Sequence, residues 1–263
     1  MPPFRPRPEP DAAPAGAPEP YYPQREDTGL LAPFARAVRR GDRVVDVGTG
    51  NGTLALAAAR ARARVVATDL NPFALRRVAA IARAEGARLD AVRTDLLRGL
   101  RRFDRILVNP PYLPTRPSQR DPDRWQNLAL DGGPDGCRVT ARLWGQLPDH
   151  LAPRGVAILL VSSLQSPARL RHLRERWIAQ GGSVARVARR ALAGETLEVW
   201  AIRSGAGERA TRGARRTARP PRGTGARRRT PADRRSGSSR APARGRTNAR
   251  GGASGRRRSL RGS

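Results

Sequence analysis

Four short segments of this 263-residue chain carry residue types that could bind a ligand and act on it. The first, Asp46 to Gly52, is a glycine-rich turn with the spacing G-x-G-x-G. Asp69 and Asp95 are the second and third, and the sequence Asn-Pro-Pro-Tyr at Asn109 to Tyr112 is the fourth. Glycines permit a tight turn and bring the backbone close to a ligand at a helix N-terminus. A dinucleotide fingerprint would need a glycine where Thr53 stands, so the turn departs from that pattern.

The two acidic residues are suited to a nucleoside. Asp69 lies nineteen residues after Gly50, and a carboxylate at this point can accept both ribose hydroxyls of an adenosine. Asp95 can accept the adenine amino group while the neighbouring Leu96 contacts the ring. Each segment taken alone has a simpler interpretation, because turns, helix caps and rigid loops use the same residue types. The order of the four segments along the chain favours the ligand-binding interpretation.

The elements that must position these segments alternate between strand and helix. This alternation predicts an α/β fold, with a doubly wound, mostly parallel, seven-stranded Rossmann-like sheet that ends in an antiparallel hairpin. Because ligands bind at the carboxyl ends of parallel strands, the four segments should meet at one edge of the sheet. The β-branched runs predict strands at 43–47, 64–68, 89–93, 103–108, 155–161, 184–187 and 197–202. Helices are expected at 53–63, 71–84 and 138–151, among others.

Taken together, the segments resemble the class I S-adenosylmethionine-dependent methyltransferases. More narrowly, they resemble the HemK-type protein glutamine methyltransferases, which modify translation release factors. Ala129 to Gly136 resembles the ALDGG-x-DG segment that follows Asn-Pro-Pro-Tyr in that family. Tyr22 to Thr28 resembles the Y-x-P-x-E-D-T motif of its short archaeal and eukaryotic branch, with the proline one place early. Asn-Pro-Pro-Tyr alone is less specific, because DNA and RNA amino-methyltransferases share it.

The resemblance implies that S-adenosylmethionine is the cofactor. It implies that Thr28 and Asp46 line the amino-acid end of the cofactor, and that the second and third segments hold its nucleoside. Glu26 and Asp27 precede an apolar helix, and we interpret them as caps of that helix. The residues expected to bind the cofactor are Thr28, Asp46, Gly48, Gly50, Asp69, Asp95 and Leu96.

The reaction implied by the resemblance is methyl transfer from a sulfonium to the side-chain amide nitrogen of glutamine. An amide nitrogen is a poor nucleophile because its lone pair is delocalised. The side-chain oxygen of Asn109 and the carbonyl of Pro110 are suited to accept its two N–H groups and to aim the lone pair at the methyl group. Prolines stiffen the loop, which preorganises these acceptors, and Tyr112 would pack against the flat substrate group. Catalysis is therefore expected from Asn109, Pro110 and Tyr112, and substrate binding from all four residues, Pro111 included.

Composition divides the chain into three parts. Residues 1–24 hold nine prolines, and residues 204–263 hold 19 of the 52 basic residues with few aliphatic side chains. Segments with so little apolar surface are expected to be disordered. Residues 25–203 are expected to form the methyltransferase domain. The arginine-rich tail is suited to contact RNA or the ribosome through phosphates, without sequence preference.

Several classes of site are excluded by the composition. A single cysteine, Cys137, excludes an internal disulfide, and two histidines leave little room for a metal cluster, so no metal is expected. The sequence offers no signal-peptide core and no membrane-spanning run, which predicts a cytoplasmic protein. Three tryptophans, Trp144, Trp177 and Trp200, are expected in the core, whereas Trp125 is left without an assigned role.

Two other functions remain open at this stage. An amino-methyltransferase of nucleic-acid bases would use the same acceptors for adenine, cytosine or guanine, and the net charge of +30 suits such a substrate. A non-catalytic RNA-binding protein on a methyltransferase core is disfavoured by the intact motifs. The leading hypothesis is a protein glutamine methyltransferase that acts on a release factor. The short branch of that family is expected to work with a small activating subunit.

Overall fold

The computed structural model describes residues 26–205. The chain divides into two units, Met1–Thr217 and Ala218–Ser263, and every described residue belongs to the first. The predictions for residues 1–24, for the tail beyond 205 and for the Tyr22 end of the entry motif therefore lie outside the described residues.

The predicted sheet is confirmed. Seven strands form one sheet in the order β3-β2-β1-β4-β5-β7-β6, and the first five pair in parallel. Strand β7 pairs antiparallel with β5 and with β6, which completes the expected terminal hairpin. The strands are β1 (Arg43–Val47), β2 (Arg64–Asp69), β3 (Leu89–Arg93), β4 (Phe103–Val108), β5 (Leu151–Ser162), β6 (Ser183–Leu192) and β7 (Glu195–Arg203).

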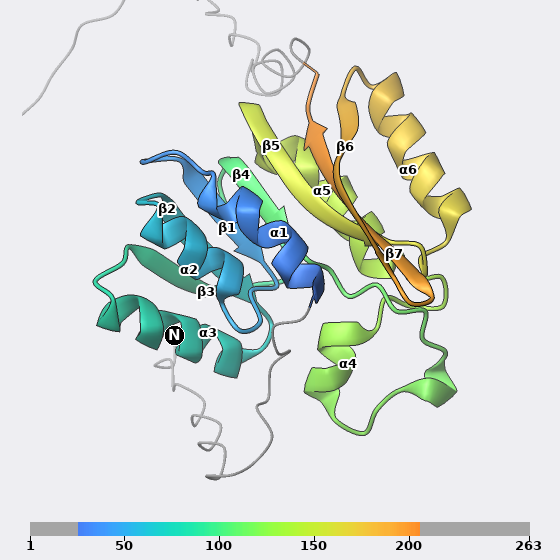
Figure 1. Cartoon of the computed structure of the whole chain (residues 1–263), viewed down its shortest axis with the longest axis horizontal. Helices are drawn as coiled ribbons and strands as arrows, with labels where there is room; N and C mark the ends of the chain where they lie inside the picture. Colours follow the sequence, from blue (N-terminus) through green and yellow to red (C-terminus); the bar gives the residue numbers. More distant parts are fainter. Residues whose placement is uncertain (1–25, 206–263) are drawn as a thin grey trace, which may run out of the picture. The chain divides into compact units, whose positions relative to one another are not determined.

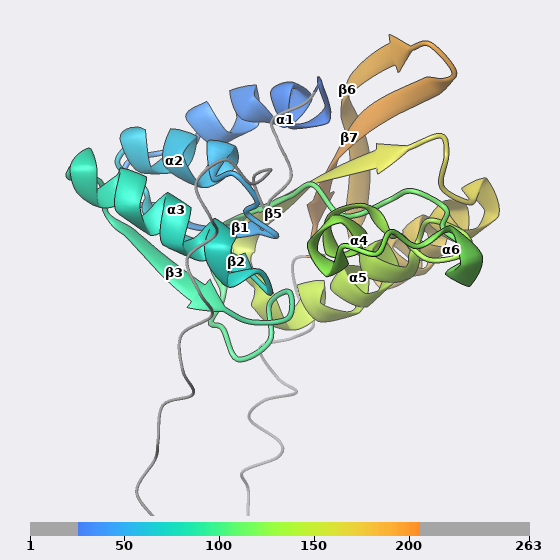
Figure 2. The same ribbon diagram turned by 90° about the horizontal axis from the view of Figure 1, so that it is seen from below.

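Helices cover both faces of the sheet (Figures 1 and 2). Side chains alternate between the two faces of each strand, so β1 sends Val44 to one hydrophobic cluster and Val45 to the other. The Val44 cluster packs under α1, α2 and α3, and the Val45 cluster packs under α5 and α6. The helices are α1 (Glu26–Arg36), α2 (Thr53–Arg60), α3 (Pro72–Ala84), the 3-10 turn η1 (Pro117–Gln119), α4 (Arg124–Leu130), α5 (Arg138–His150) and α6 (Pro167–Ala179).

Three tryptophans form the centre of the second cluster, as predicted. The ring of Trp144 makes edge-to-face contacts with Trp177 and Trp200, at centroid distances of 6.3 and 6.1 Å. The indole N–H of Trp177 donates to the carbonyl of Arg203, which ties α6 to the end of β7. These contacts hold the terminal hairpin against the parallel part of the sheet.

Several predicted boundaries were wrong. Helix α2 ends at Arg60 instead of Ala63, because Arg62 takes a left-handed φ of 63° that ends the helical hydrogen bonding. Strand β5 begins at Leu151, which the sequence placed in the preceding helix, because Leu151 pairs with Phe103 across an irregularity in the ladder. The short helix α4 was not predicted, since its polar neighbourhood lacks an apolar repeat.

The turn after β1 depends on one glycine that α3 overlies. Gly52 begins α2 with φ 86°, and an added Cβ would lie 2.8 Å from Cγ2 of Val78. Gly41 has a similar φ of 84°, but nothing lies within 4 Å of its Cβ position. The two glycines therefore share the same backbone constraint and differ only in the packing above them.

We expect Gly52→Ala to destabilise the fold by about 1–3 kcal/mol more than Gly41→Ala, because overpacking adds to a left-handed cost of about 1–2 kcal/mol that both share. Urea unfolding of the two variants measures the difference. Equal losses of unfolding free energy would show that Val78 does not constrain the turn.

Candidate active site

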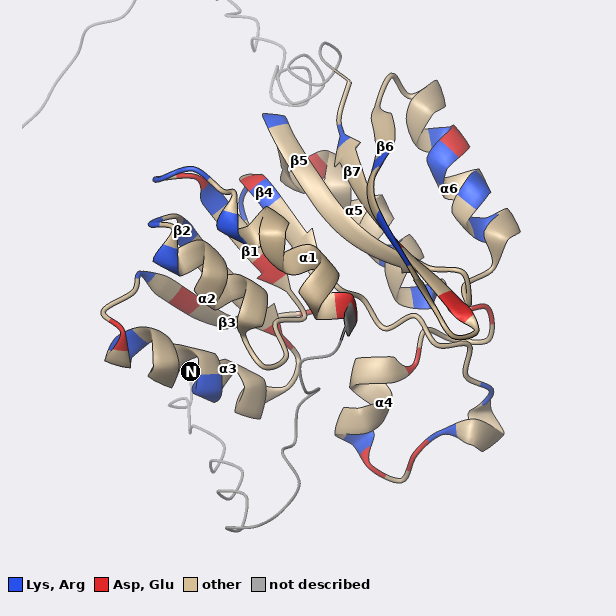
Figure 3. Ribbon diagram, viewed as in Figure 1, with Lys and Arg blue, Asp and Glu red and all other residues tan. Residues whose placement is uncertain are grey.

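The predicted site residues meet at one edge of the sheet, as expected. They line a cavity of about 420 Å³ at the carboxyl ends of β1 to β4, a size typical of small-molecule sites. Acidic residues of α1, β1 and the start of β7 lie toward this edge (Figure 3). The lining includes Thr28, Asp46, Gly48, Gly50, Asp69, Asp95, Leu96 and Asn109 to Tyr112, which are all of the predicted binding and catalytic residues.

Asp69 fastens the glycine-rich turn to the end of β2. One carboxylate oxygen accepts the backbone N–H of Gly50 at 3.0 Å, and the other accepts that of Asn71 at 2.8 Å. Burial raises the pKa of this carboxyl, while backbone hydrogen bonds from Asn71, Gly50 and Leu70 lower it. A carboxylate has about four acceptor sites, so it can still accept from a ligand hydroxyl. The residue therefore has a structural role that the sequence did not reveal, beside the binding role that it did suggest.

Gly48 lets the turn approach a ligand. Its φ is 70°, and no protein atom lies within 4 Å of the position that a Cβ would take. A side chain here would be strained and would project beside the cavity that the turn lines. Glycine thus keeps both the backbone conformation and the space.

Asp46 is buried at the end of β1 and is 1 % exposed. One of its oxygens accepts the hydroxyl of Thr49 at 2.8 Å and the backbone N–H of Ala55 at 3.0 Å. Desolvation nevertheless raises the pKa of Asp46 to about 7, and the nearby charge of Asp69 acts in the same direction. A cation in the cavity would favour the ionised form of this carboxyl.

Asp95 and Leu96 follow β3 at the far end of the cavity. The carboxylate of Asp95 forms an ion pair with Arg142 of α5, which the sequence did not suggest. Leu96 takes a left-handed φ of 57°, which is unusual for a residue with a side chain. Its neighbour Leu97 is fully buried, and its backbone N–H donates to Oε1 of Gln146 at 2.9 Å.

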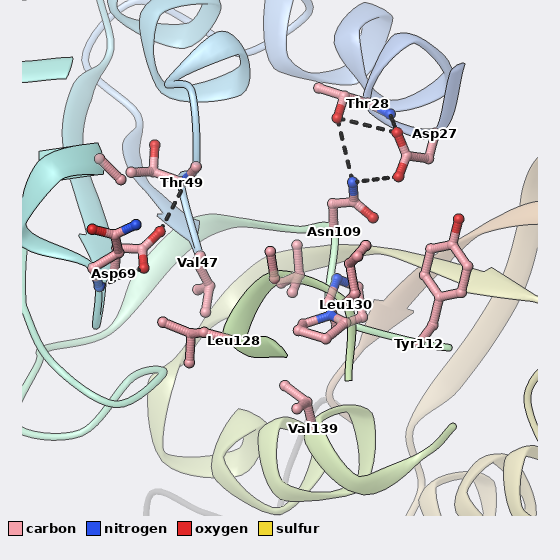
Figure 4. Close-up of a pocket in the computed structure, with 18 of the residues that line it drawn as sticks. Asp27, Thr28, Val47, Thr49, Asp69, Asn109, Tyr112, Leu128, Leu130 and Val139 are labelled. Carbon is pink, nitrogen blue, oxygen red and sulfur yellow. Dashed lines mark hydrogen bonds between the residues drawn. The ribbon is translucent and has the colours of Figure 1, made fainter. Parts of the chain in front are cut away.

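Asn109 follows β4 and is held from one side only. Its Nδ2 donates to Oδ2 of Asp27 at 3.1 Å and to Oγ1 of Thr28 at 3.3 Å (Figure 4). Its Oδ1 is buried and has no hydrogen-bond partner among the described residues. A buried acceptor without a partner costs about 1–3 kcal/mol, so an arrangement of this kind calls for a bound donor.

The Ala129 to Gly136 segment braces the Asn-Pro-Pro-Tyr loop. Leu113 directly after the loop donates its N–H to the carbonyl of Leu130 and accepts from Gly132. The carboxylate of Asp131 accepts the N–H of Gly133 at 2.8 Å and forms ion pairs with Arg120 and Arg138. These arginines lower the pKa of Asp131, although burial opposes them. The conspicuous Asp-Gly-Gly sequence therefore positions the loop.

The comparisons with known proteins agree with this geometry. Residues 27–128 match the family model of the methyltransferase small domain. The putative protein N5-glutamine methyltransferase of Methanocaldococcus jannaschii is 36% identical over 148 residues, which cover 56% of this chain and 74% of that protein. The chain belongs to the HemK-type protein glutamine methyltransferase family. A release factor glutamine methyltransferase of Deinococcus radiodurans is 37% identical over 164 residues, 58% of each chain.

A solved structure agrees with this family assignment. The Mtq2–Trm112 complex of E. cuniculi, described as responsible for methylation of the eRF1 termination factor, matches with a TM-score of 0.55 and 26% identity. The match covers 71% of this chain and 99% of the chain compared. A further relative, the ribosomal protein uL3 glutamine methyltransferase of Bradyrhizobium diazoefficiens, is 37% identical over 138 residues, 49% of this chain and 42% of that protein.

Sequence reasoning missed two groups of residues in this methyltransferase site. Asp27 was interpreted as a helix cap, but it lies inside α1, is 4 % exposed and binds Asn109. Trp125 of α4 also lines the cavity and meets Phe73 of α3 edge-to-face, with ring centroids 5.9 Å apart. Both contacts join segments far apart in the sequence, so no local sequence pattern predicts them.

Two further features of residues 26–205 bear on the chemistry of the methyltransferase. Burial raises the pKa of the Cys137 thiol to about 11, so it stays protonated. Within residues 26–205 there is no group of histidines, cysteines and acids that could hold a metal ion. None of the described helices is long and apolar enough to cross a membrane.

The buried carboxyl of Asp46 should make stability depend on pH. Its pKa of about 7 in the folded state lies above the ordinary 3.8 expected after unfolding, so the unfolded chain loses this proton first. The contribution of Asp46 to the unfolding free energy is therefore fully present below about pH 4 and falls as the pH rises to about 7.

The neutral variant Asp46→Asn isolates this contribution, because its amide oxygen can keep both hydrogen bonds. Between pH 5 and 6.5 the unfolding free energy of the unmodified protein should fall relative to the variant by about 1 kcal/mol per pH unit. Urea unfolding across this range measures the difference. A difference that stays constant with pH would contradict the raised pKa.

Proposed function

We propose that this chain transfers a methyl group from S-adenosylmethionine to the side-chain amide nitrogen of a glutamine in a translation release factor. The observation that carries the proposal is the buried Oδ1 of Asn109, an acceptor without a partner among the described residues at the wall of the cavity. The amide nitrogen of glutamine brings two donors. One can satisfy Asn109, and the carbonyl of Pro110, next along the loop, is suited to the other.

The cavity residues fit S-adenosylmethionine. Asp69 lines the cavity as a carboxylate suited to accept from ribose, and Asp95 with Leu96 offers an acceptor beside an apolar surface for adenine. The open space at Gly48 and the buried carboxyl of Asp46 suit the cationic end of the cofactor, together with Thr28 and Gly50. When bound, the cofactor would supply an electrophilic methyl group, with a neutral thioether as the leaving group.

The residues of the chain then act on the acceptor amide. Hydrogen bonds to Asn109 and Pro110 hold both N–H groups, so the nitrogen lone pair is turned toward the methyl group. These acceptors gain strength as positive charge develops on the nitrogen, which lowers the barrier. Tyr112 ends the loop and lines the cavity, where its ring can offer a flat face to the amide. The nitrogen finally loses one proton to solvent, so no strong base is required.

The charge of the cavity favours a protein over a nucleic acid as substrate. Its lining includes Asp27, Asp46, Asp69, Asp95 and Glu195 but only one arginine, Arg142, which already pairs with Asp95. A lining with five acidic residues and one paired arginine suits a neutral glutamine side chain better than a polyanion. The net charge of +30 therefore says little about the substrate, because much of it lies outside the cavity.

The names of the relatives guide the choice of substrate and partner. Three of them are described as acting on a release factor, a termination factor or a ribosomal protein, all of which function in translation. The termination-factor relative is a complex with a small second protein, Trm112. We propose that this chain likewise acts on a release factor and that a small partner protein of that kind supports its activity.

The direct test is incubation of the chain with S-adenosylmethionine and purified release factors, followed by mass spectrometry of the peptides. We expect a gain of one methyl group on a glutamine, with Asn109→Ala reducing turnover by roughly two to three decades while cofactor affinity is kept. Parallel reactions contain ribosomal protein uL3, RNA or DNA, each with and without a Trm112-like protein. Methylation of a nucleic-acid base without methylation of protein would overturn the proposal.

A second test concerns cofactor binding. Asp69→Ala should weaken S-adenosylmethionine binding at least about tenfold, because each lost charge-assisted hydrogen bond costs roughly 1.5–3 kcal/mol. Asp90→Ala is the matched control, since Asp90 is an exposed residue of β3 that does not line the cavity. Isothermal calorimetry measures both affinities. Unchanged affinity in Asp69→Ala would remove the ribose assignment.

A further inference from the structure

The side-chain amide of Asn109 can take two orientations that exchange its oxygen and its nitrogen. In the observed orientation, Nδ2 faces Asp27 and Thr28 while Oδ1 is buried without a described partner (Figure 4). Only this orientation presents an acceptor to a substrate amide. The flipped orientation would present N–H donors to the N–H donors of the substrate.

We propose that Asp27 is a positioning residue of the methyl transfer, which acts by fixing the orientation of the Asn109 amide. This inference rests on the proposed function, because it assumes that Asn109 accepts a hydrogen bond from the reacting amide. Asp27 belongs to the Y-x-P-x-E-D-T motif, but the sequence analysis gave it no role other than that of a helix cap. Its contact with Asn109 joins residues 82 positions apart.

The carboxylate of Asp27 selects the orientation because it is an acceptor only. Its Oδ2 lies 3.1 Å from Nδ2 of Asn109, which is an ordinary hydrogen-bond distance. If the amide flipped, Oδ1 would face the same carboxylate oxygen at a similar distance, and two acceptors would repel each other. The hydroxyl of Thr28 does not discriminate in this way, because a hydroxyl can donate as well as accept.

Asp27 is itself held in place by its own helix. Its Oδ1 accepts the backbone N–H of Thr28 at 2.6 Å, which leaves Oδ2 directed at Asn109. Helix α1 is anchored in the first hydrophobic cluster by Leu31 and Ala35, which are fully buried. The orientation of the catalytic amide is therefore fixed by the packing of α1 on the sheet.

The charge of Asp27 adds an electronic effect to this geometric one. A hydrogen bond from Nδ2 to a carboxylate draws electron density within the amide toward Oδ1, because linked hydrogen bonds polarise each other. Oδ1 thereby becomes a stronger acceptor for the N–H of a nitrogen that gains positive charge. Removal of Asp27 should slow the methyl transfer by a larger factor than it weakens cofactor binding.

The test measures methylation of a release factor by Asp27→Ala, Asp27→Asn and Asn109→Ala, and by the double variant of Asp27→Ala with Asn109→Ala. We expect Asp27→Ala to lower kcat about tenfold to a hundredfold, measured at saturating cofactor so that any change in affinity through Thr28 does not enter. Asp27→Asn should regain only a small part of this loss, since its amide oxygen can accept from Nδ2 but its NH2 group can equally donate to a flipped Asn109 and carries no charge. The double variant should be no slower than Asn109→Ala, because Asp27 acts through Asn109. Asp90→Ala is the exposed control.

Different outcomes separate this inference from the function on which it rests. Normal turnover of Asn109→Ala would overturn the role of Asn109 and hence the proposed mechanism. Slow turnover of Asn109→Ala with normal turnover of Asp27→Ala would overturn the role of Asp27 alone. Losses that add in the double variant would mean that Asp27 touches the substrate or takes its proton, which would also overturn the inference.

A second variant guards against misfolding of Asp27→Ala. Asp27→Leu fills the same buried position and removes both carboxylate oxygens without leaving a cavity or a buried charge. We expect it to melt within a few degrees of the unmodified protein and to lose kcat to the same extent as Asp27→Ala. A folded Asp27→Leu with normal turnover would overturn the inference.

Discussion

The structure of this site depends on one constraint, the fixed orientation of a single side-chain amide. Asn109 is held at its nitrogen by Asp27 and Thr28, and its buried oxygen has no partner among the described residues. An unpaired buried acceptor disfavours the folded protein by itself. It is tolerated where a ligand supplies the missing donor. The other features of the site place this acceptor at the cavity and hold it there.

Three parts of the structure fix the position and orientation of the Asn109 amide. The parallel sheet delivers Asp46, Asp69, Asp95 and Asn109 to one edge, because each follows the carboxyl end of its strand or lies at it. Helix α1 closes over this edge from one face and supplies the residues that hold the amide. The Asp131 segment braces the loop that follows, through backbone pairing and two arginines. Binding and structural roles overlap in the same residues, since Asp69 also fastens the glycine-rich turn.

Much of the fold could be predicted from the sequence because its signals are local. A few neighbouring residues suffice to predict a β-branched strand such as Arg43–Val47 or a capped helix such as Pro72–Ala84. The cavity was predicted for a related reason, since strand ends in a parallel sheet must share an edge. Strand and helix ends were less accurate where tertiary pairing decided them, as for Leu151 at the start of β5.

The contacts that tune the site could not be predicted in this way. Asp27 and Asn109 are separated by 82 positions, and Asp95 and Arg142 by 47. Nothing in the composition around Asp27 separates a helix cap from a residue that orients a catalytic amide. Likewise, the role of Asp131 depends on arginines from two sides of a loop whose path the sequence does not specify. Such roles follow only from the packing of α1 and of the Asp131 segment.

The most direct test of this account is a nuclear magnetic resonance measurement on the protein bound to a glutamine peptide and S-adenosylhomocysteine. The side-chain N–H protons of Asn109 are assigned by their disappearance in Asn109→Ala. The account predicts nuclear Overhauser contacts from these protons to the methyl group of Thr28, because Nδ2 faces α1. Contacts from the same protons to the side-chain amide of the bound glutamine would mean that Asn109 presents a donor to the substrate, which would contradict the account.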